Sequence, residues 1–366
     1  MGNRRAPVLY PLSLIYGLLT GLRNFLYNAG LLRSAEFSTP VICVGNITAG
    51  GTGKTPLTAY IAALLCGNYK VAVLSRGYRR KSEGFVMASE SSTVKDLGDE
   101  LYQLKQNFPE IIAAADKNRV KGVKGILGEH PETSVIIMDD GFQHRRIKPG
   151  LSIVLIDHNR PVHKDFMLPY GNLRESRRNL SRADVLVVTK SPPGLTPVNR
   201  RIFLKELKAA PYQKVFFSAI SYGKPRPVFG NRRSEILSPA RLSFNDSGIV
   251  LITGIAYPDP LKEYLGNFFV EIIHLCYPDH YQYKESDINK MSDSLKSLRS
   301  AVRFAITTEK DAVRLTEFNN IAEPLRKVFY FIPAGIVFPD NTGPAFDNLI
   351  LDYVRKNKGD NRVSQR

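Results

Sequence analysis

Short apolar runs alternate with longer amphipathic stretches along most of the chain after residue 40. The runs are rich in Val, Ile and Leu, and the stretches between them carry apolar residues at helical spacing. This alternation is typical of parallel βαβ units. It predicts strands at residues 41–45, 71–75, 111–114, 135–138, 152–156, 185–189, 215–219, 249–253, 270–275 and 302–307. The predicted fold class is therefore α/β.

Lys148, Pro149 and Gly150 interrupt this alternation near the middle of the chain. Pro and Gly together are strong local signals for a break. We therefore predict a first lobe over residues 36–150 and a second α/β lobe over residues 151–366, preceded by a separate N-terminal segment over residues 1–35. A chain of 366 residues is long enough for two domains with buried cores.

The N-terminal segment differs from the rest, because residues 11–32 are mostly apolar and residues 1–33 contain four arginines and no acidic residue. A transmembrane helix needs about 20 nearly uncharged residues, and Arg23, Asn24 and Asn28 interrupt this stretch. A signal peptide would need a small-residue cleavage site, and no convincing one follows. Neither a spanning helix nor an export signal is therefore favoured.

Two interpretations of this segment remain. It is an amphipathic helix in a membrane interface, with leucines and aromatics in lipid and arginines at anionic head groups, or a helix packed on the protein's own core. Both predict a helix. They differ in whether protein covers its apolar face.

Composition narrows the possible classes of protein. Lys and Arg number 51 against 34 Asp and Glu, and the formal net charge of +17 favours an anionic partner: nucleic acid, an acidic membrane surface or a phosphorylated substrate. Cys43, Cys66 and Cys276 form no C-x-x-C pair, so a reducing cytoplasm fits better than a disulfide framework. The six histidines show no H-E-x-x-H or similar spacing, so no dedicated transition-metal site is predicted.

A glycine-rich loop follows the first predicted strand and precedes a helical pattern that begins at Pro56. Its residues are Thr48, Ala49, Gly50, Gly51, Thr52, Gly53, Lys54 and Thr55. In a P-loop, glycines let backbone N–H groups face phosphate oxygens, the lysine reaches the β and γ phosphates, and the Ser/Thr hydroxyl holds Mg²⁺. The helix N-terminus adds its positive dipole end. Strand, loop and helix predict a nucleotide site, although Thr48 replaces the usual first glycine.

The nucleotide base is predicted by exclusion. No N-K-x-D guanine-reading motif occurs, and neither residues 189–192 nor residues 308–311 supply that spacing. ATP is therefore favoured over GTP. Ala49 stands where partitioning and metal-insertion ATPases often place a second lysine, which counts against those classes.

An acidic pair, Asp139 and Asp140, follows the strand predicted at residues 135–138. A carboxylate beside a P-loop would serve Mg²⁺, which prefers oxygen ligands and neutralises charge on the β and γ phosphates. The alternative is an acidic turn without chemical function, which is common at strand ends. Combined with the glycine-rich loop, the pair favours a Mg²⁺-nucleotide site.

A second compact acidic site, Asp99 and Glu100, follows a loop rich in Ser and Thr. Kinases need a group that orients or deprotonates the acceptor hydroxyl, and one of these carboxylates could be that base. The same residues could instead cap the helix that continues through Leu101. His280 could assist a carboxylate partner, although a lone histidine is more often structural.

These motifs together resemble the tetraacyldisaccharide 4′-kinases, which phosphorylate the membrane-embedded lipid A precursor. The resemblance spans most of the chain and rests on GNITAGGTGKTP at residues 45–56, SRGY at 75–78, GDE at 98–100, DDGFQH at 139–144, LRE at 173–175, RAD at 182–184 with TK at 189–190, and PDH at 278–280. Several motifs in the expected order are more specific than any one. The departures are small: Leu101 follows Glu100 where the family often has proline, and Ser176 follows the LRE motif.

The resemblance implies a fold and a reaction. The fold would be two α/β/α sandwich lobes with mainly parallel sheets, of which the P-loop NTPase-like N-terminal lobe binds nucleotide and the second lobe closes over ATP. With Mg²⁺, the enzyme would transfer the γ-phosphate of ATP to the 4′-hydroxyl of a tetraacylated glucosamine disaccharide 1-phosphate, in lipid A biosynthesis.

The resemblance also implies roles for individual residues. Asp99 would be the catalytic base with His280 as its partner, and Lys54 would stabilise the transferring phosphate. The Mg²⁺ ligands would come from Thr55, Glu100, Asp139, Asp140 and Gln143. Contacts to substrate or phosphate would come from Tyr78, His144, Arg174 and Glu175.

An acylated glycolipid stays in the bilayer, so its kinase must work at the membrane surface, where the apolar, Arg-bearing N-terminus would place it. We therefore expect a monomeric, peripheral protein at the cytoplasmic face of the inner membrane of a Gram-negative bacterium, without a nucleic-acid partner. A P-loop ligase or regulatory NTPase would have no use for a lipid-facing N-terminus. A nucleic-acid-binding NTPase would explain the charge, but no RNA-binding aromatic motif or concentrated basic stripe is present. Both rivals predict ATP turnover without a glycolipid.

Overall fold

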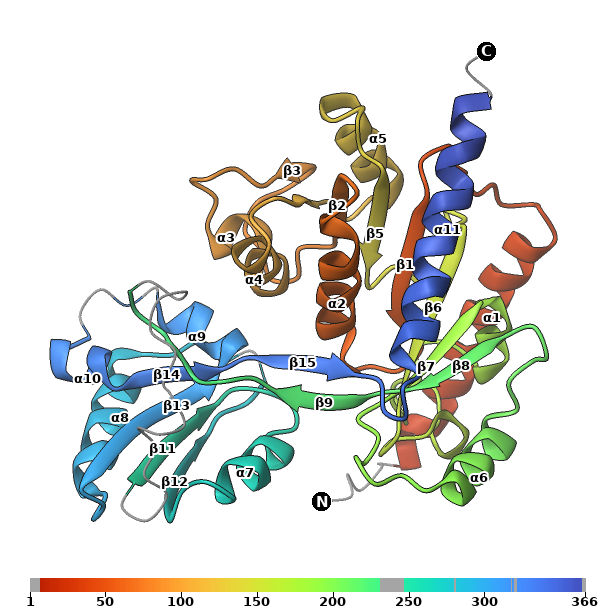
Figure 1. Ribbon diagram of the computed structural model, residues 1–366. Coiled ribbons are helices and arrows are strands. Elements are labelled where there is room, and N and C mark those ends of the chain that lie inside the picture. The colour runs from red at the N-terminus through yellow and green to blue at the C-terminus, as the bar shows by residue number, and fades with distance from the viewer. Residues whose placement is uncertain (1–6, 231–246, 280, 317, 319–320, 364–366) are drawn as a thin grey trace. The chain divides into compact units, whose positions relative to one another are not determined.

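The computed structural model describes residues 7–230, 247–279, 281–316, 318 and 321–363, with side chains described through residue 357. Two compact units make up the chain: Met1–Ile220 with Ile336–Arg366, and Ser221–Gly335. The chain passes from one unit to the other within strands β9 (Ala219–Tyr222) and β15 (Ala334–Val337), which pair as a separate two-stranded sheet (Figure 1).

The first unit is built on an eight-stranded sheet with the strand order β3-β4-β2-β5-β1-β6-β7-β8. The strands are β1 (Val41–Asn46), β2 (Val71–Ser75), β3 (Val86–Met87), β4 (Ile112–Ala115), β5 (Val135–Asp139), β6 (Leu151–Asp157), β7 (Val185–Thr189) and β8 (Lys214–Phe217). All pair in parallel except β3 with β4. The central strands are buried along their whole length, which explains why they are continuous apolar runs rather than alternating ones.

Helices cover both faces of this sheet (Figure 1). One face packs against α2 (Lys54–Cys66), α4 (Asp99–Asn107), which follows the short α3 (Val94–Leu97), and α11 (Gly343–Val363). The other packs against α5 (Arg119–Glu129), α6 (Pro197–Leu207) and the 3-10 helix η3 (Arg177–Arg182). A further 3-10 helix, η2 (Val162–Lys164), lies between β6 and η3 in the chain. The first unit is thus an α/β/α sandwich with a core on each side of the sheet.

The second unit has a five-stranded sheet with the order β10-β14-β13-β11-β12, parallel except where β10 pairs with β14. Its strands are β10 (Arg226–Pro227), β11 (Ser247–Thr253), β12 (Glu271–Cys276), β13 (Val302–Thr308) and β14 (Phe329–Ile332). Helix α7 (Asp259–Gly266) packs on one face. Helices α8 (Glu285–Ser297), α9 (Glu309–Leu315) and α10 (Glu323–Lys327) pack on the other. The α/β class and the mainly parallel sheets predicted from sequence are confirmed.

The boundary predicted at residue 150 differs from the division in the structure. Strands β6, β7 and β8 continue the first sheet, because β6 pairs with β1 on the side opposite β5. The Lys148–Gly150 break is therefore an ordinary connection between two strands of one sheet. The chain leaves the first unit only after Ile220 and returns to it at Ile336.

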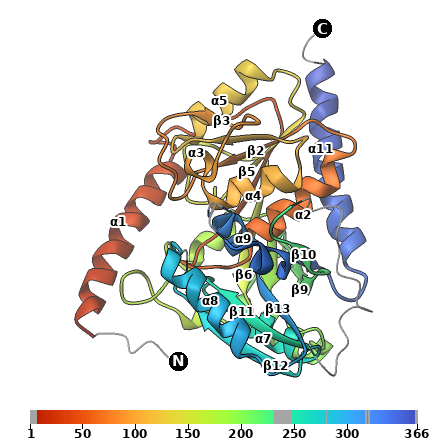
Figure 2. The same cartoon turned by 90° about the vertical axis from the view of Figure 1, so that its left-hand side faces the viewer.

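The N-terminal helix α1 (Tyr10–Asn28), preceded by the 3-10 helix η1 (Pro7–Leu9), runs along the outside of the first unit (Figures 1 and 2). Its buried residues are polar, Ser13 and Asn24. Most of its large apolar residues are exposed, with Leu18 at 73% and Phe25 at 63% of their possible surface. The apolar face is therefore not packed on the protein's own core, which makes that interpretation of the segment wrong. None of the helices in the described residues is both long and apolar enough to cross a membrane.

Candidate active site

The glycine-rich loop lies where β1 ends and α2 begins at Lys54. Gly50 and Gly53 have φ values of 95° and 90°, in the region that glycine adopts at little cost. Thr48 is not among the described residues with positive φ. Because the backbone at position 48 is ordinary, a side chain is tolerated there, and the departure from the usual glycine is explained. We call residues 48–55 the phosphate loop.

Hydrogen bonds fix the phosphate loop from within. Asn46, the last residue of β1, donates through Nδ2 to the Thr48 carbonyl at 2.6 Å and to the Thr52 hydroxyl at 2.7 Å. Both threonines are buried, and Thr52 is fully so. The side chain of Asn46 thus connects the start of the loop to its middle.

Neighbouring strand ends brace the loop from outside. The Thr189 hydroxyl at the end of β7 donates to the Thr52 carbonyl at 2.8 Å. Lys190 Nζ donates to the Gly51 carbonyl at 2.5 Å and pairs with Asp157, at the end of β6, at 2.7 Å. Thr189 and Lys190 belong to a motif shared with the resembled family, whereas no motif in the sequence singled out Asp157. The available signal was their position at the carboxyl ends of parallel strands, where ligands of open α/β sheets bind.

The acidic pair lies beside the phosphate loop because of strand register. Strand β5 pairs with β1 in parallel, and Asp139 is level with Val44. The Asp139 side chain is 1% exposed and accepts a hydrogen bond from the Thr58 hydroxyl of α2 at 3.0 Å. Burial, together with the nearby charges of Glu100 and Asp140, raises the pKa of Asp139 to about 7. Glu100 and Asp140 are therefore near enough to Asp139 for their charges to act on it.

Asp140 lies between two cations. Its carboxylate is 3.7 Å from Lys54 Nζ and 3.1 Å from Arg174 NH1. Burial opposes ionisation, but Lys54 and Arg174 hold the pKa of Asp140 below its usual value. The structure thus unites Lys54, Asp140 and Arg174, which lie in three separate motifs of the sequence.

These donors fit the Mg²⁺ that a nucleotide brings. Mg²⁺ binds to proteins through one or two carboxylates together with phosphate oxygens and water. Thr55 is in the first turn of α2, and Gln143 donates through Nε2 to the Asn46 carbonyl at 2.6 Å, which places it against the loop. The described residues contain no group of three or more His, Cys, Asp and Glu arranged to hold a metal ion. An ion held here would take its remaining ligands from phosphate and water.

Asp99 and Glu100 form the first turn of α4, and Gly98 is the N-cap. Gly98 has a φ of 81°, and a Cβ there would come within 2.5 Å of the Tyr78 carbonyl, so only glycine fits against that backbone. Asp99 is therefore not the cap residue that the alternative interpretation supposed. Tyr78 is exposed, and its loop packs directly against the start of α4. The predicted partner His280 lies outside the described residues.

One predicted substrate contact is wrong. Glu175 is 0% exposed, and its carboxylate is occupied by side chains of the protein. Arg23 and Arg182 form ion pairs with it, and Asn24 donates to it at 3.3 Å. A ligand cannot reach this carboxylate, because α1 covers it. Sequence spacing gave no warning, since Arg23 and Asn24 are more than a hundred residues away along the chain.

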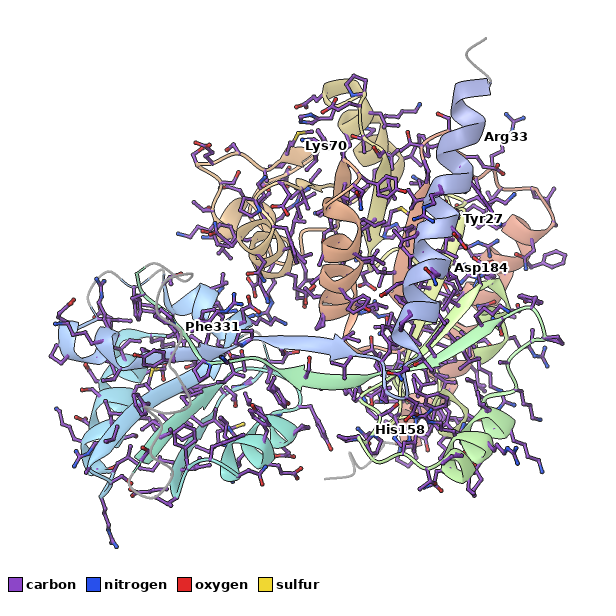
Figure 3. All side chains as sticks on the ribbon, viewed as in Figure 1. Tyr27, Arg33, Lys70, His158, Asp184 and Phe331 are labelled. Atoms are coloured by element: carbon purple, nitrogen blue, oxygen red, sulfur yellow. The ribbon has the colours of Figure 1, made fainter. Side chains whose placement is uncertain are left out.

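A cavity of about 270 Å³ opens where α1 meets the loop after β5. We call it the cationic cavity; its lining comes from Arg23, Tyr27, Lys117, Asn118, Arg119, Gln143, His144, Arg145 and Arg146. Tyr27, labelled on α1 in Figure 3, lies under the Arg145 guanidinium, 5.1 Å from the ring centroid. Burial and the charges of Arg119 and Arg76 lower the pKa of His144 to about 4, so this histidine is neutral near pH 7.

Arg119 links the cationic cavity to the acidic pair. It is 2% exposed, lines the cavity and donates to the Asp139 carbonyl at 3.0 Å. Burial lowers its pKa to about 10, which leaves the guanidinium charged near neutral pH. Sequence analysis did not single out this residue, which sits inside an ordinary-looking basic stretch at the start of α5.

The phosphate loop, which includes Lys54, and the acidic pair beside it are the features of a P-loop phosphotransferase. The family model for tetraacyldisaccharide-1-P 4′-kinase matches residues 5–355. Curated relatives named tetraacyldisaccharide 4′-kinase are 41% identical over 363 residues in Bacteroides thetaiotaomicron, covering 98% of this chain and 96% of the relative, and 40% identical over 355 residues in Flavobacterium johnsoniae, covering 97% and 99%. The chain therefore belongs to the tetraacyldisaccharide 4′-kinase family.

A solved structure supports the same assignment. LpxK from Aquifex aeolicus, crystallised in complex with ATP, aligns with a TM-score of 0.71 at 26% identity, covering 95% of this chain and 98% of that one. The predicted class of enzyme, an ATP-dependent kinase of lipid A biosynthesis, is confirmed by these matches.

Proposed function

We propose that this chain transfers the γ-phosphate of ATP to the 4′-hydroxyl of a tetraacylated glucosamine disaccharide 1-phosphate at a membrane surface. The observation that carries the proposal is the exposed apolar face of α1, on the same unit as the phosphate loop. Exposed apolar patches of this kind mark contacts with lipid or protein. A water-soluble acceptor would not explain why the leucines of α1 are exposed.

The proposed setting is the cytoplasmic face of the inner membrane, where ATP and the lipid acceptor meet. α1 would lie in the interface with its leucines among acyl chains, and the positive net charge of +17 would favour anionic head groups. We propose a monomeric, peripheral enzyme without a nucleic-acid partner.

In the donor half of the site, backbone amides of the phosphate loop and the α2 N-terminus would bind the β and γ phosphates. Lys54, whose Nζ lies 3.7 Å from the Asp140 carboxylate, would stabilise the negative charge on the transferring phosphoryl group. Thr55, Glu100, Asp139, Asp140 and Gln143 would hold Mg²⁺. When bound, the ion neutralises charge on the β and γ oxygens and on the leaving ADP.

In the acceptor half, Asp99 would take the proton of the 4′-hydroxyl. As that oxygen bonds to the γ-phosphorus, the bond from this phosphorus to the β–γ bridging oxygen breaks and ADP leaves. We propose that His280 assists Asp99. Tyr78 and Arg174 would contact the sugar or the phosphate. The exposure of Tyr78 and the ion pair of Arg174 with Asp140 support this proposal.

The cationic cavity would take the 1-phosphate that the acceptor already carries. It is bounded by α1 on one side and by the loop after Asp139 on the other, so it lies between the proposed lipid surface and the proposed metal site. Its arginines and lysine can form charge-assisted hydrogen bonds with a phosphate. His144, neutral near pH 7, can add a hydrogen bond without adding charge.

Asp99→Asn tests the reaction. With Mg-ATP and detergent-dispersed lipid, we expect kcat to fall by roughly 10²- to 10⁴-fold, while ATP affinity is retained because the phosphate loop is untouched. Asp96→Asn is the matched control, since Asp96 belongs to the capping box of α3 rather than to the site. Wild-type protein that hydrolyses ATP but never labels the lipid would refute the acceptor, and near-normal kcat in Asp99→Asn would refute the base.

Lys117→Met tests the cavity. We expect the KM for the lipid to rise roughly tenfold, because a hydrogen bond to a charged group is lost, with little change in kcat. An acceptor lacking the 1-phosphate supplies the control: with it, variant and wild type should have the same KM. A KM difference that persists with this acceptor would place the 1-phosphate elsewhere.

A further inference from the structure

Residues 172–175 lie between the phosphate loop and α1; we call them the link segment. On the loop side, Ala49 N donates to the Asn172 carbonyl at 2.7 Å, and Arg174 N donates to the Ile47 carbonyl at 2.7 Å. Thr48 and Leu173 form an antiparallel bridge between these two bonds. The link segment therefore pairs, like a short strand, with the backbone at the start of the phosphate loop.

The opposite side of the link segment is held by α1. Tyr16 donates through its hydroxyl to the Arg174 carbonyl at 3.1 Å. Arg23 and Asn24, one turn from the end of the helix, bond to the two oxygens of Glu175 at 3.2 and 3.3 Å. These contacts come from the polar face of α1, so the helix holds the link segment without covering its own apolar residues.

Glu175 is the most enclosed part of this arrangement. Its carboxylate is fully buried and is shared by Arg23 of α1 and Arg182 of η3. The Arg182 guanidinium also lies over the Phe142 ring, 4.1 Å from its centroid, and donates to the Phe142 carbonyl at 3.3 Å. Phe142 follows the acidic pair, and a Cβ on Gly45 would come within 2.6 Å of its Cβ. One buried charge therefore connects α1, η3, the link segment and the acidic loop.

We propose that Glu175 is a positioning residue for phosphoryl transfer: its carboxylate locks the link segment between α1 and the phosphate loop, and so holds Arg174 against Asp140 and Asp140 near Lys54. α1 is then a brace for the phosphate site as well as a lipid-facing helix. The inference rests on the proposed function for the reaction whose rate is measured. Its effect on nucleotide affinity can be measured without the lipid.

The variant Glu175→Gln keeps the shape of the side chain and removes its charge. It leaves the largely buried Arg182 and the partly exposed Arg23 without their counter-ion. We expect kcat to fall roughly 10- to 100-fold, as small misplacements of phosphate-binding groups produce, and the affinity for Mg-ATP by calorimetry to fall as well. The KM for the lipid should stay within about twofold. Glu36→Gln is the matched control, because Glu36 pairs with Lys148 on the surface of the same unit at 2.9 Å, and its kcat should be normal.

Because removal of a buried charge can unfold the chain, Tyr16→Phe is measured alongside. It deletes one hydrogen bond from α1 to the Arg174 carbonyl, and we expect kcat and Mg-ATP affinity to fall by roughly threefold to tenfold. Full kcat and full nucleotide affinity in Tyr16→Phe would overturn the proposal, even if Glu175→Gln does not fold. A raised lipid KM with unchanged kcat and nucleotide affinity in Glu175→Gln would make Glu175 a determinant of acceptor binding instead. If the wild type fails to phosphorylate the lipid, only the proposed acceptor falls, and the calorimetry still decides the role of Glu175.

Discussion

The first unit has a long helix near each end of the chain, α1 and α11. The two helices bury opposite kinds of side chain. α11 places Phe346, Ile350 and Val354 at helical spacing against the sheet and α2, and all three are 0% exposed. α1 has an equally amphipathic pattern, but it buries Ser13 and Asn24 and leaves its leucines outside. The same periodicity thus gives a core helix at one end and an outward-facing one at the other.

The difference lies in what each helix finds on the protein. Beside α11 stand apolar partners: the rings of Phe216 and Phe338 lie 5.2 and 4.5 Å from that of Phe346. Beside α1 stand backbone carbonyls and a carboxylate, which accept from Ser13, Tyr16 and Asn24. An amphipathic pattern predicts that an apolar stripe will be covered, but the partners decide whether protein or another phase covers it.

We expect the largest effect from a substitution in α11, the helix that packs on the core. Phe346→Ala in α11 should lower the free energy of unfolding by about 3–5 kcal/mol, because a buried ring is lost and a cavity remains. Phe25→Ala, the same substitution on the exposed face of α1, should cost no more than about 0.5 kcal/mol. Urea unfolding followed by circular dichroism measures both. Equal losses in the two variants would mean that the apolar face of α1 is covered by protein after all.

Local patterns explain what sequence could predict. Most strands of the two large sheets could be predicted, because runs of Val, Ile and Leu of strand length are typical of strands in largely buried parallel sheets. Strands β3 and β10 are two residues long, too short for any pattern, and β14 was missed as well. The extent of the first unit was not predicted, because the pairing of β6 with β1 joins residues more than a hundred positions apart.

The residues of the candidate site also fall into those that a local motif identifies and those whose partners are distant in the sequence. Lys54 and Asp139 could be proposed from sequence because each stands in a contiguous motif whose chemistry follows from neighbouring residues. The bracing of the phosphate loop by Lys190 depends on a carbonyl 139 positions away. Glu175 was assigned to substrate because its motif resembles a ligand-binding one, but its partner Arg23 lies 152 positions upstream. Sequence motifs therefore identify residues that contact ligands more readily than they identify residues that hold those side chains in position.

The exposed leucines of α1 should control how strongly the protein binds to lipid. Replacing Leu18 and Leu22 together by serine removes two exposed apolar side chains from α1 and none of its polar contacts. Each fully buried leucine contributes about 1.5–3 kcal/mol, so partitioning onto anionic liposomes should weaken by roughly 10²-fold or more. Sedimentation with vesicles containing phosphatidylglycerol measures it.

Deleting residues 1–33 would be a poorer test of lipid binding, since it also removes Tyr16, Arg23 and Asn24 from the link segment. Val198→Ser and Ile202→Ser on α6 provide the matched control, because both side chains are exposed apolar residues on another helix of the same unit. Unchanged sedimentation of the Leu18→Ser, Leu22→Ser protein would move the lipid contact away from α1.

The smallest expected effect concerns how α11 is fastened to the sheet. Tyr353 accepts from Val41 N and donates to the Val41 carbonyl, both at 3.1 Å, at the start of β1. Burial raises the pKa of Tyr353 to about 12, so the folded state holds the phenol proton more tightly than the unfolded chain, where it leaves near pH 10. This contribution to stability is complete below pH 10 and is lost as the pH rises through 12.

Tyr353→Phe should therefore cost about 1 kcal/mol at pH 7 through its lost hydrogen bonds, and its stability should decline less steeply than that of the wild type between pH 10 and 12. Tyr10→Phe serves as the control, because Tyr10 is 44% exposed and the substitution keeps its ring contacts with Phe166 and Tyr170; its cost in stability should stay below about 0.5 kcal/mol. Urea midpoints measured across this pH range decide the matter. Parallel pH profiles for Tyr353→Phe and wild type would show that the Tyr353 phenol does not help to hold α11 on the sheet. The buried apolar side chains of α11 would then be the whole difference between its packing and that of α1.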